Sequence, residues 1–450
     1  MSRDGFSVTV MHLNCLIQIP MLMSQEKDLT RQDNGQRWDP VDIEKRKMED
    51  AYDRYASLII DRLASFGPGK ANNWLNADRV SWPKPFYKGS YNGSNALMLM
   101  LHSEKEGFKV PVFITRDRLN SLNYQKDPSG NSMAAVDDNG VKLPFVHVSK
   151  GSRSFPVIKS QATITHKESK AEISYYKYAQ LSPAEQTAYQ VCYSPMVENV
   201  FNIDQTNLAE SRPELYQRLV EENQPRLMDA DQANFRLESV DCLVSNKLWI
   251  CDFDTTYEGE PFYNVREKKV VIPNREMLCG GNKYYSTLFH KLTLSAIDSD
   301  MVTKTERMDD GHYDSEHARR ILAGELCSLL VCQRYGIRKA LEEESLEFRE
   351  RWMRMLKEHP MYARSVLRDV KESCGLMTVR IDCIQQVFID KDKDKSDDLR
   401  EDGESEGIDV NGDGVVDAND VHYSPDRKQG SQEGRGESEE ETHKKGGFRR

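Results

Sequence analysis

The stretch 284-YYSTLFHKLTLSAI-297 decides how the C-terminal half of this 450-residue chain is interpreted. The sequence predicts a helix here, from about residue 282 to residue 298. His290 lies in the middle of that helix, and Leu294 follows it by four positions. Because residues four positions apart share one face of a helix, the side chains of His290 and Leu294 are expected to lie side by side.

This spacing is that of an H-E-x-x-H motif in which the general base and the second zinc ligand have been replaced. In such a motif two histidines on one helix face bind zinc, and the glutamate acts as general base on the zinc-bound water. Here Lys291 stands at the glutamate position and Leu294 at the second histidine position. A charged lysine does not accept that proton and leucine does not bind metal. The sequence therefore predicts no catalytic residue and no bound zinc here.

Three segments around this helix follow one another in a recognisable order: 263-YNVREKKVVIPNREML-278, 288-LFHKLTLS-295 and 324-GELCSLLVCQRYGI-337. Together they resemble the zincin-like domain of the ArdC-type antirestriction proteins. The resemblance implies that His290 is the surviving first metal ligand and that Glu325 matches the downstream ligand of that family. Lys291 and Leu294 depart from the pattern at the base and at the second ligand. The expected domain is thus a degenerate zincin with four vestigial site residues.

The N-terminal half carries the same resemblance in four further segments: 74-WLNADRVSWPKPFYKGSYNGSNALMLML-101, 112-VFITRDRL-119, 149-SKGSRSFPVI-158 and 200-VFNIDQTN-207. Their order is similar to that of the N-terminal domain of the ArdC-type proteins, so the resemblance extends over about residues 45–389. It implies a domain that binds single-stranded DNA in a protein of a mobile or conjugative element.

The charge of the N-terminal half also suits a polyanionic partner. Residues 70–170 hold 15 basic against 8 acidic side chains, although the whole chain has a net charge of −11. Single strands bind where cationic side chains follow the phosphates and aromatic rings stack on the bases. The sequence therefore predicts single-stranded DNA as the partner. The predicted contacts are Lys84, Lys88, Tyr91, Lys150 and Arg153.

The sequence predicts an α+β protein of two domains with polar ends. Residues 44–210 are expected to form a mixed α/β domain that resembles the DNA-binding part of the family. Residues 211–389 are expected to form the mainly helical, zincin-like domain. Residues 1–43 are expected to be a disordered leader, and residues 390–450 an acidic tail.

Within these domains the apolar pattern predicts individual elements. Short apolar runs between turn clusters occur at 97–101, 110–114, 143–148 and 155–158, and they are typical of strands with one or two helices among them. A helix is expected from about residue 44 to Gly67, another after Ser182-Pro183, and others at about 213–222, 314–336, 342–358 and 360–389. Three aromatic residues are expected in the core: Trp74, Phe113 and Phe145.

The acidic tail contains a calcium-binding motif of the EF-hand or dockerin-like kind, 409-DVNGDGVVDAND-420. Calcium takes six to eight oxygen ligands, and this twelve-residue spacing supplies them around a sharp turn, here at Gly414. Aspartate replaces the usual glutamate at position 12. The predicted calcium ligands are Asp409, Asn411, Asp413, the carbonyl of Val415, Asp417 and Asp420.

A second calcium loop is suggested at 390-DKDKDKSDDLRE-401, but it departs from the motif. Lys395 stands where glycine is needed, and Asp397 replaces the apolar position 8. A run of charged residues produces such spacing by chance as well. The ligands of this second loop would be Asp390, Asp392, Asp394, Ser396, Asp398 and Glu401.

Nine cysteines without a C-x-x-C pair indicate neither a disulfide framework nor a zinc knuckle, which favours a reducing, cytoplasmic location. No stretch is apolar enough to suggest a membrane span. The preferred function is single-stranded DNA binding with a catalytically inactive zincin-like domain. Two alternatives stay open: a metallopeptidase with a rearranged zinc site, and a calcium-dependent interaction protein whose tail contacts another protein.

Overall fold

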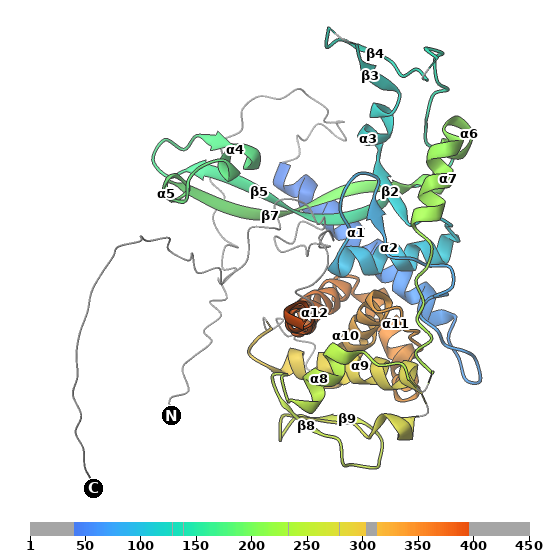
Figure 1. The fold of residues 1–450 in the computed structure, drawn as a ribbon, viewed down its shortest axis with the longest axis vertical. Helices are drawn as coiled ribbons and strands as arrows, with labels where there is room; N and C mark the ends of the chain where they lie inside the picture. The colour runs from blue at the N-terminus through green and yellow to red at the C-terminus, as the bar shows by residue number, and fades with distance from the viewer. Residues whose placement is uncertain are drawn as a thin grey trace, which may run out of the picture.

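The computed structural model describes residues 40–127, 129–137, 139–232, 234–278, 280–302 and 313–395. Within these ranges the chain is an α+β protein, as predicted, with a mixed N-terminal part and a mainly helical C-terminal part (Figure 1). The predicted leader overlaps the described chain only at residues 40–43, which begin the first helix. The rest of the leader and residues 396–450 lie outside the described residues.

The N-terminal part is built on a five-stranded sheet of order β1-β2-β7-β5-β6, against which two helices pack. Only β1 and β2 run parallel, and the other neighbours are antiparallel. The helix from Pro40 to Ala64 confirms the predicted first helix. The elements are α1 (Pro40–Ala64), β1 (Lys84–Pro85), α2 (Gly93–Glu106), β2 (Val112–Thr115), β5 (Phe155–His166), β6 (Glu172–Ile173) and β7 (Tyr189–Asn202).

Two strands of this sheet extend far beyond it as an arm (Figure 1). β5 and β7 pair along their length, from Phe155 opposite Val200 to His166 opposite Tyr189. Two short helices, α4 (Tyr175–Ala179) and α5 (Pro183–Gln186), lie at the tip. Ser182 and Glu185 form a capping box at α5, which confirms the helix predicted after Ser182-Pro183.

Two of the four predicted strands are wrong. Residues 97–101 lie in α2, because this helix is buried from Asn95 to Ser103 and a helix apolar on every face shows no amphipathic period. Residues 143–148 form no named strand, and Phe145, expected in the core, is 56% exposed. The runs at 110–114 and 155–158 do enter strands, β2 and β5.

Around Phe145 the chain forms a second, smaller projection. It consists of a short helix that continues β2 and a two-stranded hairpin. These elements are α3 (Arg116–Ser121), β3 (Tyr124–Lys126) and β4 (Ser132–Ala134).

The C-terminal part is mainly helical, as predicted, and its centre is the pair α9 and α10. α9 (Gly281–Asp298) and α10 (Tyr313–Arg334) confirm the helices expected at about 282–298 and 314–336. A three-stranded sheet and several short helices surround this pair. These are α8 (Glu238–Ser245), β8 (Asp252–Asp254), β9 (Phe262–Asn264), β10 (Lys269–Val271), η3 (Glu343–Phe348) and α11 (Arg349–Glu358). Two further helices, α6 (Leu208–Ser211) and α7 (Pro213–Glu222), pack on the N-terminal part, where Leu208 and Leu215 share a second hydrophobic cluster with Val112 (Figure 1).

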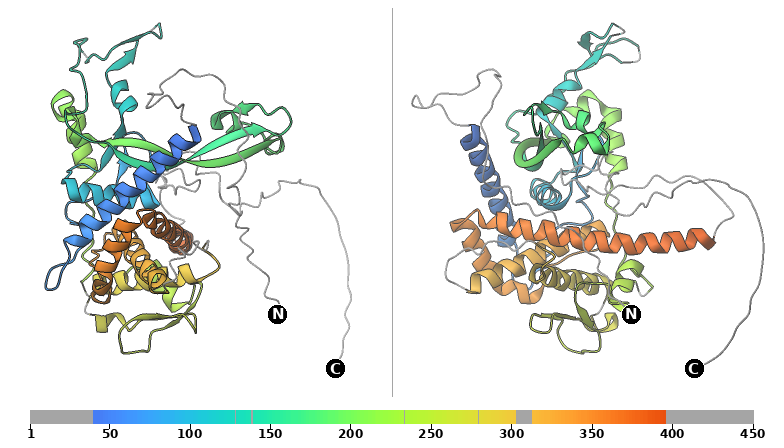
Figure 2. Two further views of the ribbon diagram at one scale, coloured as in Figure 1. Left: turned by 180° about the vertical axis from the view of Figure 1, so that it is seen from behind. Right: turned by 90° about the vertical axis from the view of Figure 1, so that its left-hand side faces the viewer.

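The long helix α12 (Tyr362–Lys395) joins the two parts, because it packs on α2 as well as on α9 and α10 (Figure 2). One continuous hydrophobic cluster contains Tyr55 and Leu97 from the N-terminal part together with Leu288, Leu326 and Val370 from the C-terminal part. Burial of apolar surface drives folding, so the two parts stabilise each other.

The first residues of the second predicted calcium loop lie at the end of α12. Asp390, Asp392 and Asp394 lie in helical backbone, which spaces residues along an axis and does not curl around an ion as an EF-hand loop does. Ser396, Asp398 and Glu401 lie outside the described residues. In the part of the chain that the structure describes, no helix is long and apolar enough to cross a membrane.

Candidate functional sites: an arginine pocket and a buried lysine–glutamate cluster

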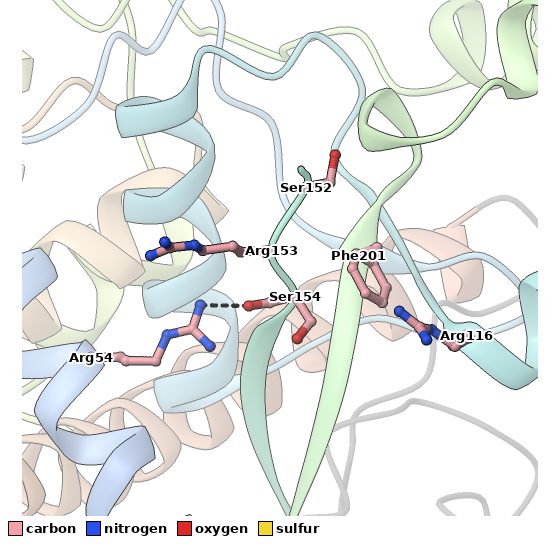
Figure 3. Close-up of a pocket in the computed structure, with 6 residues that line it drawn as sticks. All are labelled: Arg54, Arg116, Ser152, Arg153, Ser154 and Phe201. Carbon is pink, nitrogen blue, oxygen red and sulfur yellow. Dashed lines mark hydrogen bonds between the residues drawn. The ribbon is translucent and has the colours of Figure 1, made fainter. Parts of the chain in front are cut away.

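Three arginines from separate segments converge on an open pocket at the base of the β5–β7 arm (Figure 3). Arg54 comes from α1, Arg153 from the loop before β5, and Arg116 from the first position of α3. Figure 3 shows Arg54 and Arg153 beside each other and Arg116 against the ring of Phe201. The pocket has a volume of about 550 Å³, and its lining also includes Ser152 and Ser154.

Aromatic rings and the backbone fix two of these guanidinium groups. The Cζ atom of Arg54 lies 5.2 Å from the ring centroid of Phe155, and its guanidinium donates a hydrogen bond to the carbonyl of Ser154. The Cζ atom of Arg116 lies 5.7 Å from the ring centroid of Phe201. A cation held over an aromatic face is oriented before any ligand arrives.

The pocket has an unbalanced positive charge. Burial lowers the pKa of Arg54, and the neighbouring charge of Arg153 lowers it further, which shows that the two cations repel each other. Among the described residues no carboxylate forms an ion pair with Arg54, Arg116 or Arg153. Burial, together with Arg54 and Lys105, lowers the pKa of His102 to about 4, so His102 adds no charge at pH 7. Such a pocket favours an anion.

The structure brings only one of the predicted DNA contacts, Arg153, into this pocket. Lys84, Lys88 and Lys150 are exposed at other places on the N-terminal part. Tyr91 corrects an expectation: it is only 3% exposed and packs edge-on against Phe113, with ring centroids 6.3 Å apart. Its ring is therefore not available to stack on a base.

Arg54 and Arg116 were not among the predicted contacts. Arg54 lies about a hundred residues before Arg153 on an ordinary amphipathic helix, and no local pattern marks it. Arg116 follows β2 in the resembling segment 112–119, and only the sheet brings it next to Phe201.

In the C-terminal part, the structure brings together the two residues that the resemblance implied as metal ligands. His290 on α9 and Glu325 on α10 are both fully buried, with 3.5 Å between Nδ1 of His290 and Oε1 of Glu325. The ring edge that carries Nε2 lies against Gly324, where a Cβ atom would come within 2.5 Å of Nε2. Neither ring nitrogen makes a hydrogen bond within the described chain.

A lysine that sequence reasoning missed occupies the other side of Glu325. The Nζ atom of Lys339 lies 3.1 Å from Oε2 of Glu325 and 2.8 Å from Oε1 of Glu342. Burial alone lowers the pKa of Lys339, but Glu325 and Glu342 outweigh burial and raise it above its usual value. Burial likewise opposes ionisation of Glu342, yet Lys339 holds the pKa of Glu342 below its usual value. Lys339 and Glu342 are thus held in their charged forms although both are buried.

The N-terminal part reaches into this cluster. The indole Nε1–H of Trp74 donates a hydrogen bond to Oε2 of Glu325 at 3.2 Å. The backbone N–H of Trp74 donates to the carbonyl of Lys339 at 3.1 Å, and that of Leu341 donates to the carbonyl of Asn72 at 2.8 Å. These bonds join residues far apart in the sequence at one buried contact.

The two positions that depart from the zinc motif also have structural roles. Lys291 is 3% exposed, and its ammonium forms an ion pair with Glu344. Leu294 is partly buried on α9, one turn beyond His290, and its carbonyl accepts a hydrogen bond from Arg320. Neither side chain offers a metal ligand or a base.

Comparison with known families matches two separate ranges of the chain. Residues 49–194 match the N-terminal domain of the anti-restriction factor ArdC. Residues 250–365 match the zincin-like metallopeptidase domain MPTase-PolyVal. The chain is an ArdC-type protein. Arg54, Arg116 and Arg153 lie in the first matched range, and Glu325 and Lys339 lie in the second.

Comparison with solved structures finds the antirestriction protein ArdC from the R388 plasmid. Its metal-free crystal structure is 18% identical to this chain, with a TM-score of 0.49. The match covers 74% of this chain and 98% of the R388 protein. Its Mn(II)-bound structure is 16% identical, with a TM-score of 0.46, and the match covers 73% of this chain and 97% of the R388 protein. No curated protein sequence matches at a significant level.

A metallopeptidase fold implies a metal, but the residues of this ArdC-type protein do not fit one. Across the described ranges, no three His, Cys, Asp or Glu side chains come together as a metal-binding group. A tetrahedral zinc site needs at least three protein ligands, and the second-histidine position holds Leu294. The ammonium of Lys339 already contacts Glu325.

Proposed function

We propose that this ArdC-type protein binds single-stranded DNA, as an antirestriction-like protein of a mobile element, and that its zincin-like domain hydrolyses no peptide bonds. The observation that supports DNA binding is the convergence of Arg54, Arg116 and Arg153 on one pocket without a carboxylate partner among the described residues. Guanidinium groups present planar sets of donors that match phosphate oxygens.

The N-terminal part has the two features that binding of a single strand requires. Its arginines provide positive charge for phosphates, and Lys150 extends that charge along the exposed turn before Arg153. Exposed aromatic rings lie elsewhere on the same N-terminal part, and Tyr124 and Phe145 are each more than half exposed. These rings replace Tyr91 as the residues expected to stack on bases.

Removing charge from the pocket is expected to weaken DNA binding. The variant with Arg116→Gln and Arg153→Gln is expected to lose roughly tenfold or more in affinity for a labelled single-stranded oligonucleotide, measured by fluorescence anisotropy at low salt. The slope of log affinity against log salt is expected to fall by about 1.4, because each lost phosphate contact contributes about 0.7 for single strands.

Arg354→Gln combined with Lys357→Gln is the matched control, because it removes two exposed charges from α11 in the other domain. It is expected to change neither the affinity nor the slope by more than a general charge effect. If this control and the Arg116→Gln/Arg153→Gln variant behave alike, the pocket is not the DNA site. If the wild-type protein does not bind at low salt, the DNA function itself is wrong.

The absence of peptidase activity is proposed from the groups at the motif positions. The base position holds Lys291, paired with Glu344, and an ammonium group does not accept a proton. The ligand position holds Leu294. Hydrolysis of an unfolded protein substrate that stops with a chelator would contradict this proposal and favour a rearranged zinc site.

We also propose that residues 409–420 bind calcium, from the ligand spacing alone, because these residues lie outside the described ones. Asp409→Ala is expected to weaken calcium binding at least tenfold by calorimetry, because it removes the position-1 carboxylate. Asp426→Ala removes one acid just beyond the loop and is expected to leave the affinity unchanged. Equal losses in both variants would show only diffuse binding to an acidic tail.

A further inference from the structure

We propose that the ammonium group of Lys339 replaces the metal ion of the zincin fold and serves as a permanent cation that joins the two domains. This inference goes beyond the proposed DNA-binding function and does not depend on it. It accounts for a disagreement: residues 250–365 match a metallopeptidase domain, yet the described residues of that range contain no metal-binding group.

The first argument is position. Glu325 is the residue that the family resemblance assigns as a metal ligand, and its two oxygens face different groups. Oε1 lies 3.5 Å from Nδ1 of His290, and Oε2 lies 3.1 Å from Nζ of Lys339. The positive charge therefore meets the same carboxylate that would otherwise bind the metal, within the same buried cluster.

The second argument is charge. Burying a carboxylate away from water costs free energy unless a nearby cation and hydrogen bonds compensate for the lost hydration. Glu325 is 0% exposed, and its partners are the ammonium of Lys339, the indole of Trp74 and the backbone N–H of Glu342. Lys339 is itself fully buried and also pairs with Glu342, so it is held in place.

The third argument is the location of the cluster at the contact between the two domains. Lys339 begins a segment that forms an isolated antiparallel bridge between Ala340 and Asn73. Trp74, on that same N-terminal segment, donates its indole hydrogen bond to Glu325. A cation supplied by the chain keeps this contact formed whether metal is present or absent, whereas a bound ion could be removed.

The metal test compares four proteins: the wild type, Leu294→His, Lys339→Met, and Leu294→His combined with Lys339→Met. Each is purified with zinc throughout, passed over a desalting column and analysed for zinc per chain. Only the combined variant is expected to hold about one zinc, because it alone provides a second histidine and frees Glu325. Stoichiometric zinc in Leu294→His with Lys339 in place would overturn the proposal, as would a folded combined variant without zinc.

The stability test uses thermal unfolding of the full chain. With calcium present in excess, a chelator that prefers transition metals over calcium is expected to leave the Tm of the wild type unchanged. A fall of several degrees would show a resident metal and overturn the proposal. Lys339→Met is expected to lower the Tm by roughly 10 °C, because Glu325 loses its cation.

A neutral pair separates the loss of charge from the loss of packing. Glu325→Leu combined with Lys339→Met is expected to recover at least half of the fall caused by Lys339→Met alone. This double variant also keeps the test valid if Lys339→Met does not fold by itself. A double variant no more stable than the single one would show that the ion pair carries no special role, which contradicts the proposal.

Discussion

Trp74→Ala is expected to lower the free energy of unfolding by about 3–5 kcal/mol, the largest effect of any single side chain considered. Trp74 is 0% exposed and packs edge-on against Phe66, with ring centroids 5.1 Å apart. Its removal leaves a cavity and also takes the indole donor away from the buried Glu325. Urea unfolding followed by circular dichroism measures the change.

Trp74→Phe separates the two contributions. Phenylalanine retains most of the apolar contact and loses only the hydrogen bond, so a decrease of about 1–3 kcal/mol is expected. Tyr176→Ala is the control for loss of an aromatic ring, because Tyr176 is 74% exposed at the tip of the arm. Its effect is expected to stay within about 0.5 kcal/mol. A loss below about 1 kcal/mol for Trp74→Ala would mean that the interdomain contact is not formed as described.

Gly324→Ala is expected to destabilise the protein by at least about 2 kcal/mol, although alanine is the better helix former. A Cβ atom at Gly324 would lie 2.3 Å from Cδ2 and 2.5 Å from Nε2 of His290. The ring of His290 is fully buried, so it has no free space into which it can move. Overpacking therefore outweighs the gain in helix propensity.

Gly375→Ala is the matched control, because Gly375 is also inside a helix and no atom would lie within 4 Å of its new Cβ. There the substitution is expected to stabilise by about 1 kcal/mol. In a His290→Ala background, Gly324→Ala is expected to stabilise as well, since the clashing ring is gone. If Gly324→Ala behaves like Gly375→Ala in the wild-type background, the close contact between α9 and α10 is wrong.

The sequence predicted the positions of the C-terminal helices α9, α10 and α12 closely, whereas the single helix expected at 342–358 is divided into η3 and α11. It failed at residues 97–101, where a helix buried on all sides has the composition of a strand. It also failed at Phe145, since an apolar run between turns does not say whether the core covers it.

The sites were predictable to different degrees. The family resemblance paired His290 with Glu325, and the structure places them 3.5 Å apart. Lys339 was not predictable, because it follows the end of α10 in a loop and reaches back to Glu325. Arg54 was missed for the same physical reason: tertiary packing alone brings it to Arg153. Local patterns predict elements, whereas these sites depend on contacts between distant segments.

The continuous hydrophobic cluster shared by both halves has a consequence for how this chain can be divided. A cut between residues 210 and 211 would follow the predicted domain boundary, yet it would expose to water the faces of α1 and α2 that pack against α10, α11 and α12. An N-terminal fragment would therefore tend to aggregate through this apolar surface. For the same reason, exchanging one half with that of a distant relative requires both sides of the contact to change together.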